Sequence, residues 1–90
     1  MAASNLEMHT VVLYSAPGCH LCEEAANGLV ALRRRHDFDL IEVDIHSGPE
    51  LARRYLLEIP VIEVDGAVVT RAPIDLEAVV AALGQRTASS

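Results

Sequence analysis

The sequence contains no lysine and no tryptophan, and its formal net charge is -6. A surface that binds nucleic acid carries a patch of basic residues, so we expect no nucleic-acid partner for this acidic chain. All seven positively charged residues are arginines, and three of them form the run Arg33, Arg34 and Arg35. We interpret this run as the solvated end of a helix, where positive charge is favourable.

Long hydrophobic runs are also absent. No apolar stretch approaches the roughly 20 residues that a membrane-spanning helix needs. The opening residues "MAASNLEMHT" lack the basic and apolar regions of a secretory signal. We therefore expect a cytoplasmic protein, in a reducing compartment, without membrane contact. The polar ends predict flexible tails at residues 1–9 and 85–90 around one domain at 10–84, which we expect to be monomeric.

What the chain does contain is an alternation of strand and helix patterns. The pattern predicts a strand at 10–15, a helix from the cysteines to the arginine run, a strand at 38–45, a short helix to Tyr55 or Leu57, strands at 60–64 and 67–71, and a helix from Asp75 to Gly84. A helix joins the first two strands, which must therefore be parallel, while the Asp-Gly pair between the last two indicates a hairpin. The order β-α-β-α-β-β-α predicts an α/β three-layer sandwich around a four-stranded mixed sheet.

Two local signals refine this pattern. Ser47 and Glu50 have the spacing of a capping box, with Pro49 in the first turn of the short helix. Gly28 either weakens its helix by about 1 kcal/mol relative to alanine or permits close packing there.

The only cysteines, Cys19 and Cys22, lie three positions apart where the first strand gives way to a helix. With Cys19 as the N-cap residue, the unpaired N–H groups of Leu21 and Cys22 point towards its sulfur and favour the thiolate. In Cys-X-X-Cys proteins such effects lower the thiol pKa from roughly 8.5 to between ~3.5 and ~7.5. We expect Cys19 to be the nucleophile and Cys22 to resolve the mixed disulfide. His20 either modulates this chemistry through a positive charge or is an exposed residue with little effect.

A cysteine pair can also form a structural disulfide or bind a metal. A structural disulfide is disfavoured in a reducing compartment, and the loop between Cys19 and Cys22 is too short to stabilise a fold much. Zinc needs four ligands, and His9, His36 and His46 show no spacing that would complete a site. We therefore expect no metal and no bound cofactor. A binding or assembly module with a non-catalytic or metal-holding cysteine pair remains the alternative.

The stretches "LYSAPGCHLCEEA" and "IPVIEVDG" and the closing helix resemble glutaredoxin-like proteins of the thioredoxin superfamily, over residues 10–84. The chain is most similar to a small bacterial group of that family. The resemblance implies a thioredoxin-like fold and a disulfide oxidoreductase in cell redox homeostasis, with a redox-active disulfide between Cys19 and Cys22. It also implies a cis Ile59–Pro60 bond facing the cysteines, with the backbone of Ile59 pairing with an incoming peptide or thiol.

The chain departs from the family where a partner would bind. Glutaredoxins that bind glutathione have Gly-Gly after the fourth strand, and Thr70-Arg71 stands there. Arg71 either pairs with a carboxylate of the substrate or caps the end of a strand. We expect protein disulfides or small thiols as partners, with glutathione a possible co-substrate that binds weakly.

Overall fold

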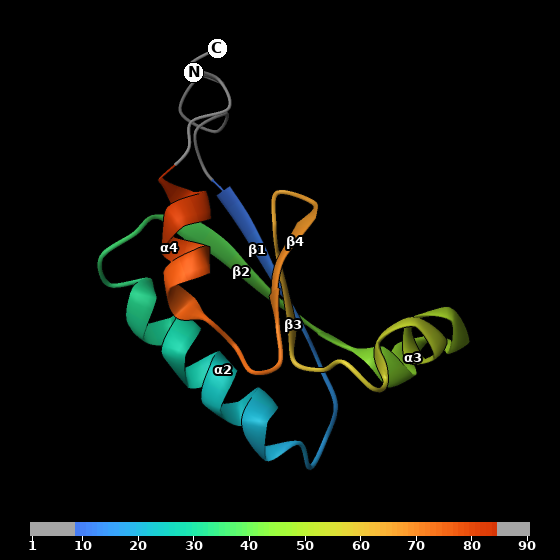
Figure 1. Ribbon diagram of the computed structural model, residues 1–90. Coiled ribbons are helices and arrows are strands. Elements are labelled where there is room, and N and C mark those ends of the chain that lie inside the picture. Colours follow the sequence, from blue (N-terminus) through green and yellow to red (C-terminus); the bar gives the residue numbers. More distant parts are fainter. Residues whose placement is uncertain (1–8, 85–90) are drawn as a thin grey trace.

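The computed structural model describes residues 9–84. Its elements are β1 (His9–Ser15), α2 (His20–Leu32), β2 (Phe38–Asp44), the 3-10 helix η1 (Ile45–Ser47), α3 (Pro49–Tyr55), β3 (Val61–Val64), β4 (Ala67–Arg71) and α4 (Leu76–Leu83) (Figure 1). The predicted α/β order with one four-stranded mixed sheet is confirmed. β1 already includes His9, which the sequence had placed in a tail. The other predicted tail residues lie outside the described part of the chain.

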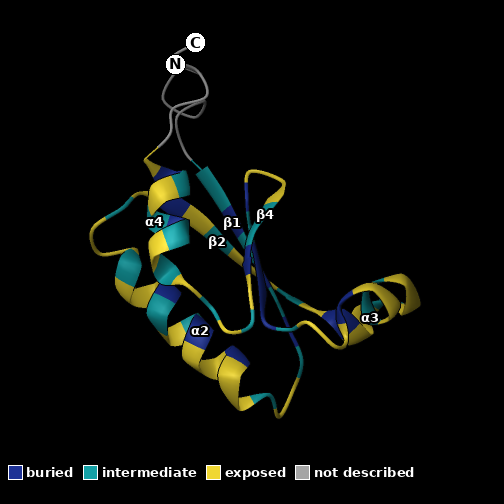
Figure 2. Ribbon diagram, viewed as in Figure 1, coloured by how far each residue is buried: buried dark blue, intermediate teal, exposed yellow. Residues whose placement is uncertain are grey.

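The strands are arranged in the order β2-β1-β3-β4. β1 and β2 are parallel, and β3 runs antiparallel to both β1 and β4. α2 and α4 lie on one face of the sheet, with their buried residues turned towards it and their exposed residues turned outward (Figures 1 and 2). The main core forms between this face and the two helices, because alternate residues of each strand point to the same face. It is built from Val11, Leu13, Ala25, Leu29, Phe38, Ile62, Val64, Val79 and Leu83.

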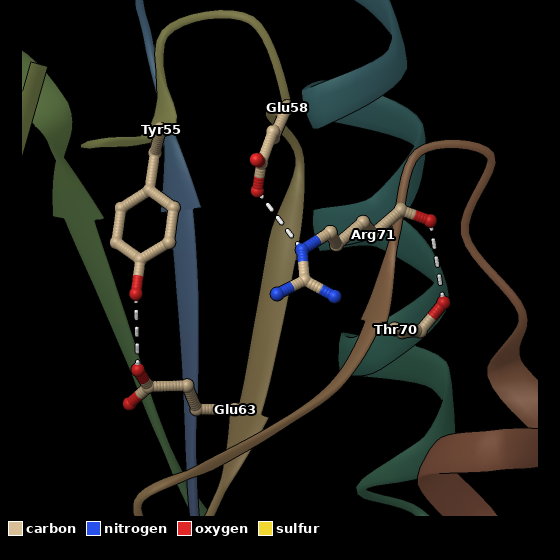
Figure 3. Close-up of polar contacts among 5 residues, drawn as sticks. All are labelled: Tyr55, Glu58, Glu63, Thr70 and Arg71. Atoms are coloured by element: carbon tan, nitrogen blue, oxygen red, sulfur yellow. Dashed lines mark hydrogen bonds and ion pairs between the residues drawn. The ribbon is translucent and has the colours of Figure 1, made fainter. Parts of the chain in front are cut away.

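The third layer is α3, which is held at one end of the opposite face by Tyr55. The ring of Tyr55 stacks on that of Tyr14, with the ring centroids 4.6 Å apart. Its hydroxyl donates to Oε2 of Glu63 at 3.5 Å (Figure 3). Burial, and then the negative charge of Glu63, raise the pKa of the Tyr14 hydroxyl. The predicted three-layer arrangement is therefore present, although the outer layer on this face is a single short helix.

The start of α3 differs from the predicted capping box. Its N-cap residue is Gly48, Pro49 occupies the first turn, and no side chain caps the helix. The carboxylate of Asp44 instead accepts a hydrogen bond from the N–H of His46 at 2.8 Å and caps η1. Because η1 includes Ser47, that residue belongs to the preceding turn and is not in the position to cap α3.

The predicted Asp65–Gly66 hairpin is confirmed and also secures the start of β1. Both residues have positive φ angles, 54° for Asp65 and 90° for Gly66, as the favoured two-residue turn requires. The Asp65 carboxylate accepts from the N–H of Thr10 at 2.9 Å and contacts Nδ1 of His9. Burial alone would raise the pKa of this carboxyl, but the bonds from Thr10 and His9 outweigh it and hold the pKa below 3.8.

Candidate redox site

The cysteine pair lies at the junction of β1 and α2, as predicted. The connecting loop turns at Gly18, whose φ of 79° suits glycine, and the N–H of Cys19 donates to the carbonyl oxygen of Ala16 at 3.3 Å. Cys19 is the N-cap residue of α2, and its Sγ accepts a hydrogen bond from the N–H of Cys22 at 3.2 Å. A helix start therefore donates directly to one sulfur of the pair. This is the arrangement that the spacing predicted.

The two sulfurs form a disulfide but differ in their surroundings. The Cα atoms of Cys19 and Cys22 lie 5.2 Å apart. Cys22 is only 2% exposed, whereas Cys19 is partly exposed. A molecule arriving from solvent therefore reaches Cys19 more readily than Cys22.

His20 is exposed and is paired along the helix. Its Nε2 lies 2.9 Å from Oε2 of Glu24, one turn further along α2. When His20 is protonated, the Glu24 carboxylate therefore offsets part of its positive charge. A modulating role of His20 at the cysteine pair stays a prediction, and its pairing with Glu24 works against that role.

Pro60 lies beside the start of α2, and the Ile59–Pro60 bond is cis, as the resemblance implied. The N–H of Ile59 donates to the carbonyl oxygen of Tyr55 at 3.0 Å. A peptide that pairs with the backbone of Ile59 would therefore have to donate an N–H to the carbonyl oxygen of Ile59. A second cis bond, Ala72–Pro73, was not predicted. Only about 5–6% of such bonds are cis in folded proteins, and nothing in the local sequence singled this one out.

A cavity of about 280 Å³ opens between the first two turns of α2, Pro60 and the segment that leads into α4. It is lined by Leu21, Glu24, Ala25, Pro60, Ala72, Pro73, Ile74 and Leu76. The residues from Ala72 to Leu76 were not predicted to belong to the site, because they are far from the cysteines along the chain. Their one signal was the Pro73 that follows the expected partner-binding position.

The side chains of Thr70 and Arg71, the two residues that stand where the resemblance led us to look for Gly-Gly, both form hydrogen bonds within the protein (Figure 3). Nε of Arg71 donates to Oε1 of Glu58 at 2.9 Å. The hydroxyl of Thr70 accepts from the N–H of Asp75 at 3.0 Å and donates to the carbonyl oxygen of Arg71 at 3.3 Å. Arg71 thus points to Glu58, and its side chain is not among those lining the cavity.

Within residues 9–84, no three or more histidine, cysteine, aspartate or glutamate side chains are grouped so that they could hold a metal ion. None of the helices in that part of the chain has the length and apolar character needed to cross a membrane.

Comparison with known proteins identifies the family. Residues 10–84, most of the chain, match the family described as Glutaredoxin-like domain (DUF836). The protein belongs to this glutaredoxin-like family. No curated protein sequence matches the chain.

Solved structures agree with a thioredoxin fold for this glutaredoxin-like protein. Protein Ne2328 from Nitrosomonas europaea is 28% identical, with a TM-score of 0.76 over 86% of this chain and 93% of that one. Oxidised thioredoxin from Plasmodium falciparum is 17% identical, with a TM-score of 0.57 over 89% and 84% of the two chains. Oxidised mitochondrial thioredoxin 3 from Saccharomyces cerevisiae is 17% identical, with a TM-score of 0.57 over 90% and 81%. Together with the Cys19–Cys22 disulfide, family and fold fit a redox role.

Proposed function

We propose that the protein is a thiol–disulfide oxidoreductase in which Cys19 is the nucleophile and Cys22 the resolving residue. The observation that carries the proposal is the hydrogen bond from the N–H of Cys22 to Sγ of Cys19, at 3.2 Å. A thiolate at Cys19 would keep this donor and gain the favourable field of the helix start. Cys22, at 2% exposure, is shielded from attack on an external disulfide.

Reduction of one substrate disulfide takes place between the two cysteines and the substrate, and an external thiol then reduces the protein again. The Cys19 thiolate attacks one sulfur of a substrate disulfide, so that a Cys19–substrate bond forms and the substrate S–S bond breaks. The leaving thiolate takes up a proton. Cys22 then loses its proton and attacks Sγ of Cys19, which forms the Cys19–Cys22 disulfide and releases the second substrate thiol. The substrate gains two electrons, and two external thiols, or one dithiol, must return two electrons to the protein as they form a disulfide of their own.

Protein disulfides are the proposed substrates, and the cytoplasm is the proposed compartment. In this proposal an extended peptide pairs with the backbone of Ile59, next to Pro60, by donating to the Ile59 carbonyl oxygen, since the Ile59 N–H already donates to the carbonyl oxygen of Tyr55. Glutathione is a possible co-substrate with weak binding, because Arg71, the residue that could receive a carboxylate, is paired with Glu58. The ion pair between Arg71 and Glu58 would have to break before Arg71 could bind a carboxylate of the substrate.

Single cysteine variants test the proposal. We expect Cys19→Ser to abolish reduction of a model protein disulfide, and Cys22→Ser to accumulate a mixed disulfide through Cys19 that mass spectrometry detects. The reduced wild-type protein should be alkylated first at Cys19 at mildly acidic pH. Labelling of Cys22 first would reverse the roles. Full activity in Cys19→Ser would remove the proposal and favour a binding or assembly module, for which metal analysis of the purified protein is the next measurement.

A further inference from the structure

The cavity beside the cysteine pair is apolar, apart from one side chain. Leu21 lies between the two cysteines, Pro60 directly precedes β3, and Ile74 and Leu76 lie on either side of the N-cap residue of α4. Its volume of about 280 Å³ lies just below the roughly 300–1,000 Å³ that is usual for pockets holding whole small molecules. A single large apolar side chain is the occupant that suits this size and lining.

Glu24 is the only charged residue among those lining the cavity, and its side chain is 62% exposed at the rim. Its Oε2 contacts Nε2 of His20 at 2.9 Å, and this contact leaves the negative charge of Glu24 uncompensated when His20 is neutral. Other carboxylates are close by in the chain. Asp75, which precedes the lining residue Leu76, places its own carboxylate on the N–H of Glu77 at the start of α4. The helix end that could attract a carboxylate is therefore already occupied by one. Since Glu58 also neutralises Arg71, the charges around the cavity favour an incoming cation.

We propose that this cavity is a specificity pocket that receives an apolar side chain of a protein substrate, next to the cysteine under attack. Glu24 at the rim then selects substrates with a basic residue beside that apolar one. The inference rests on the proposed disulfide exchange at Cys19 and names the substrate class for it. It also agrees with the proposed weak binding of glutathione, which is an anionic tripeptide without a large apolar side chain.

The first experiment measures exchange rates with short peptides. Each peptide carries one cysteine joined by a disulfide to 2-nitro-5-thiobenzoate. Attack by Cys19 of reduced Cys22→Ser protein forms the Cys19–peptide disulfide and releases the coloured thiolate. The peptides Arg-Leu-Cys-Gly, Glu-Leu-Cys-Gly and Arg-Gly-Cys-Gly are compared. We expect Arg-Leu-Cys-Gly to react about tenfold faster than Arg-Gly-Cys-Gly, because an apolar pocket discriminates between side chains of different size by such factors. Arg-Leu-Cys-Gly should react roughly two- to fivefold faster than Glu-Leu-Cys-Gly at low salt, which is the size of effect that an exposed ion pair gives.

Two substitutions in this Cys22→Ser background test the residues named. Glu24→Gln should bring the arginine-to-glutamate rate ratio close to one. Its matched control is Glu23→Gln, an exposed glutamate in the same helix turn that does not line the cavity, which should keep the ratio. Ala72→Leu fills part of the cavity and should reduce the preference for leucine. Equal changes in Glu23→Gln and Glu24→Gln, or equal rates for all peptides, would overturn the inference.

A binding measurement separates this inference from the chemistry at Cys19. Ellman's reagent, a small disulfide, reports the reactivity of Cys19 without the pocket. In parallel, the peptide Arg-Leu-Ser-Gly is titrated into the oxidised ¹⁵N-labelled wild-type protein. Shifts of the amide signals of Leu21, Ala25 and Leu76, with weaker effects from Glu-Leu-Ser-Gly, support the pocket even if Cys19 proves unreactive. Reactivity with Ellman's reagent, but no shift and no discrimination among peptides, leaves the oxidoreductase proposal standing and refutes the pocket.

Discussion

Alanine at position 28 would test the close contact between α2 and α4. A Cβ atom on Gly28 would lie 2.7 Å from Cδ1 of Leu76 and 3.7 Å from its Cδ2 and Cγ. Replacing a helical glycine by alanine stabilises a helix by about 1 kcal/mol, whereas overfilling a packed site costs about 1–3 kcal/mol. The sequence left these two effects open, and the structure assigns Gly28 to close packing.

The cavity next to Leu76 determines which effect is larger. The clashing atom is the end of a flexible, half-buried side chain, and Leu76 also lines the cavity of about 280 Å³. Leu76 Cδ1 must move from 2.7 Å to the 3.4 Å of ordinary contact, and the open space of the cavity lets it do so, which places the packing cost near the lower limit of its range. We expect Gly28→Ala to change the free energy of unfolding by less than about 1 kcal/mol, because the gain and the cost nearly cancel.

A double-mutant cycle in urea measures the cancellation. In a Leu76→Ala background the clash is gone, so Gly28→Ala should there stabilise the oxidised protein by the full amount of about 1 kcal/mol. The coupling between the two substitutions is then on the order of 1 kcal/mol or more. If Gly28→Ala stabilises both backgrounds equally, Leu76 is not in contact with position 28 and the reasoning fails.

Two further predictions concern the polar contacts of the hairpin and of the segment leading into α4. Because the pKa of Asp65 lies below its ordinary 3.8 in the folded protein, its contribution to stability is complete above that pH and is lost as pH falls through the lower value. The difference in unfolding free energy between wild type and Asp65→Asn should therefore shrink between about pH 5 and pH 2, and a constant difference would contradict this. Thr70→Val should cost about 1–3 kcal/mol in urea unfolding by leaving the Asp75 N–H unpaired, whereas Thr70→Ser should cost only about 0.8 kcal/mol for one carbon. Equal losses would show that the hydroxyl has no role.

The elements that the sequence predicted well depend on short-range signals. The Asp65–Gly66 turn needs positive φ angles, which these residue types favour, and the structure has them. Asp75 was expected to begin the last helix, and its carboxylate caps α4. The position of Cys19 at the N-cap followed from the end of a buried strand and the start of a helical pattern. In each case the neighbouring residues alone fix the local conformation.

The features that the sequence did not predict depend on contacts between distant segments. The capping-box spacing of Ser47 and Glu50 is a valid local signal, but Asp44 starts an earlier turn that uses Ser47. The pairing of Arg71 with Glu58 joins residues that no local pattern connects. The cavity likewise needs α2 and the start of α4 to be brought together, which only the folded sheet does.

The contacts that hold α4 in place also shape the proposed pocket. Leu76 packs close to Gly28 and also lines the cavity. Thr70 fixes the backbone of Asp75, the residue just before Leu76. A bulky residue at position 28 would displace Leu76 towards the cavity, so glycine there keeps the pocket open as well as bringing the helices close. Substitutions at Gly28 and Thr70 should therefore alter how well the pocket discriminates between peptides. They should leave the hydrogen bond to Sγ of Cys19 intact, because its donor is the N–H of Cys22 within the same helix turn.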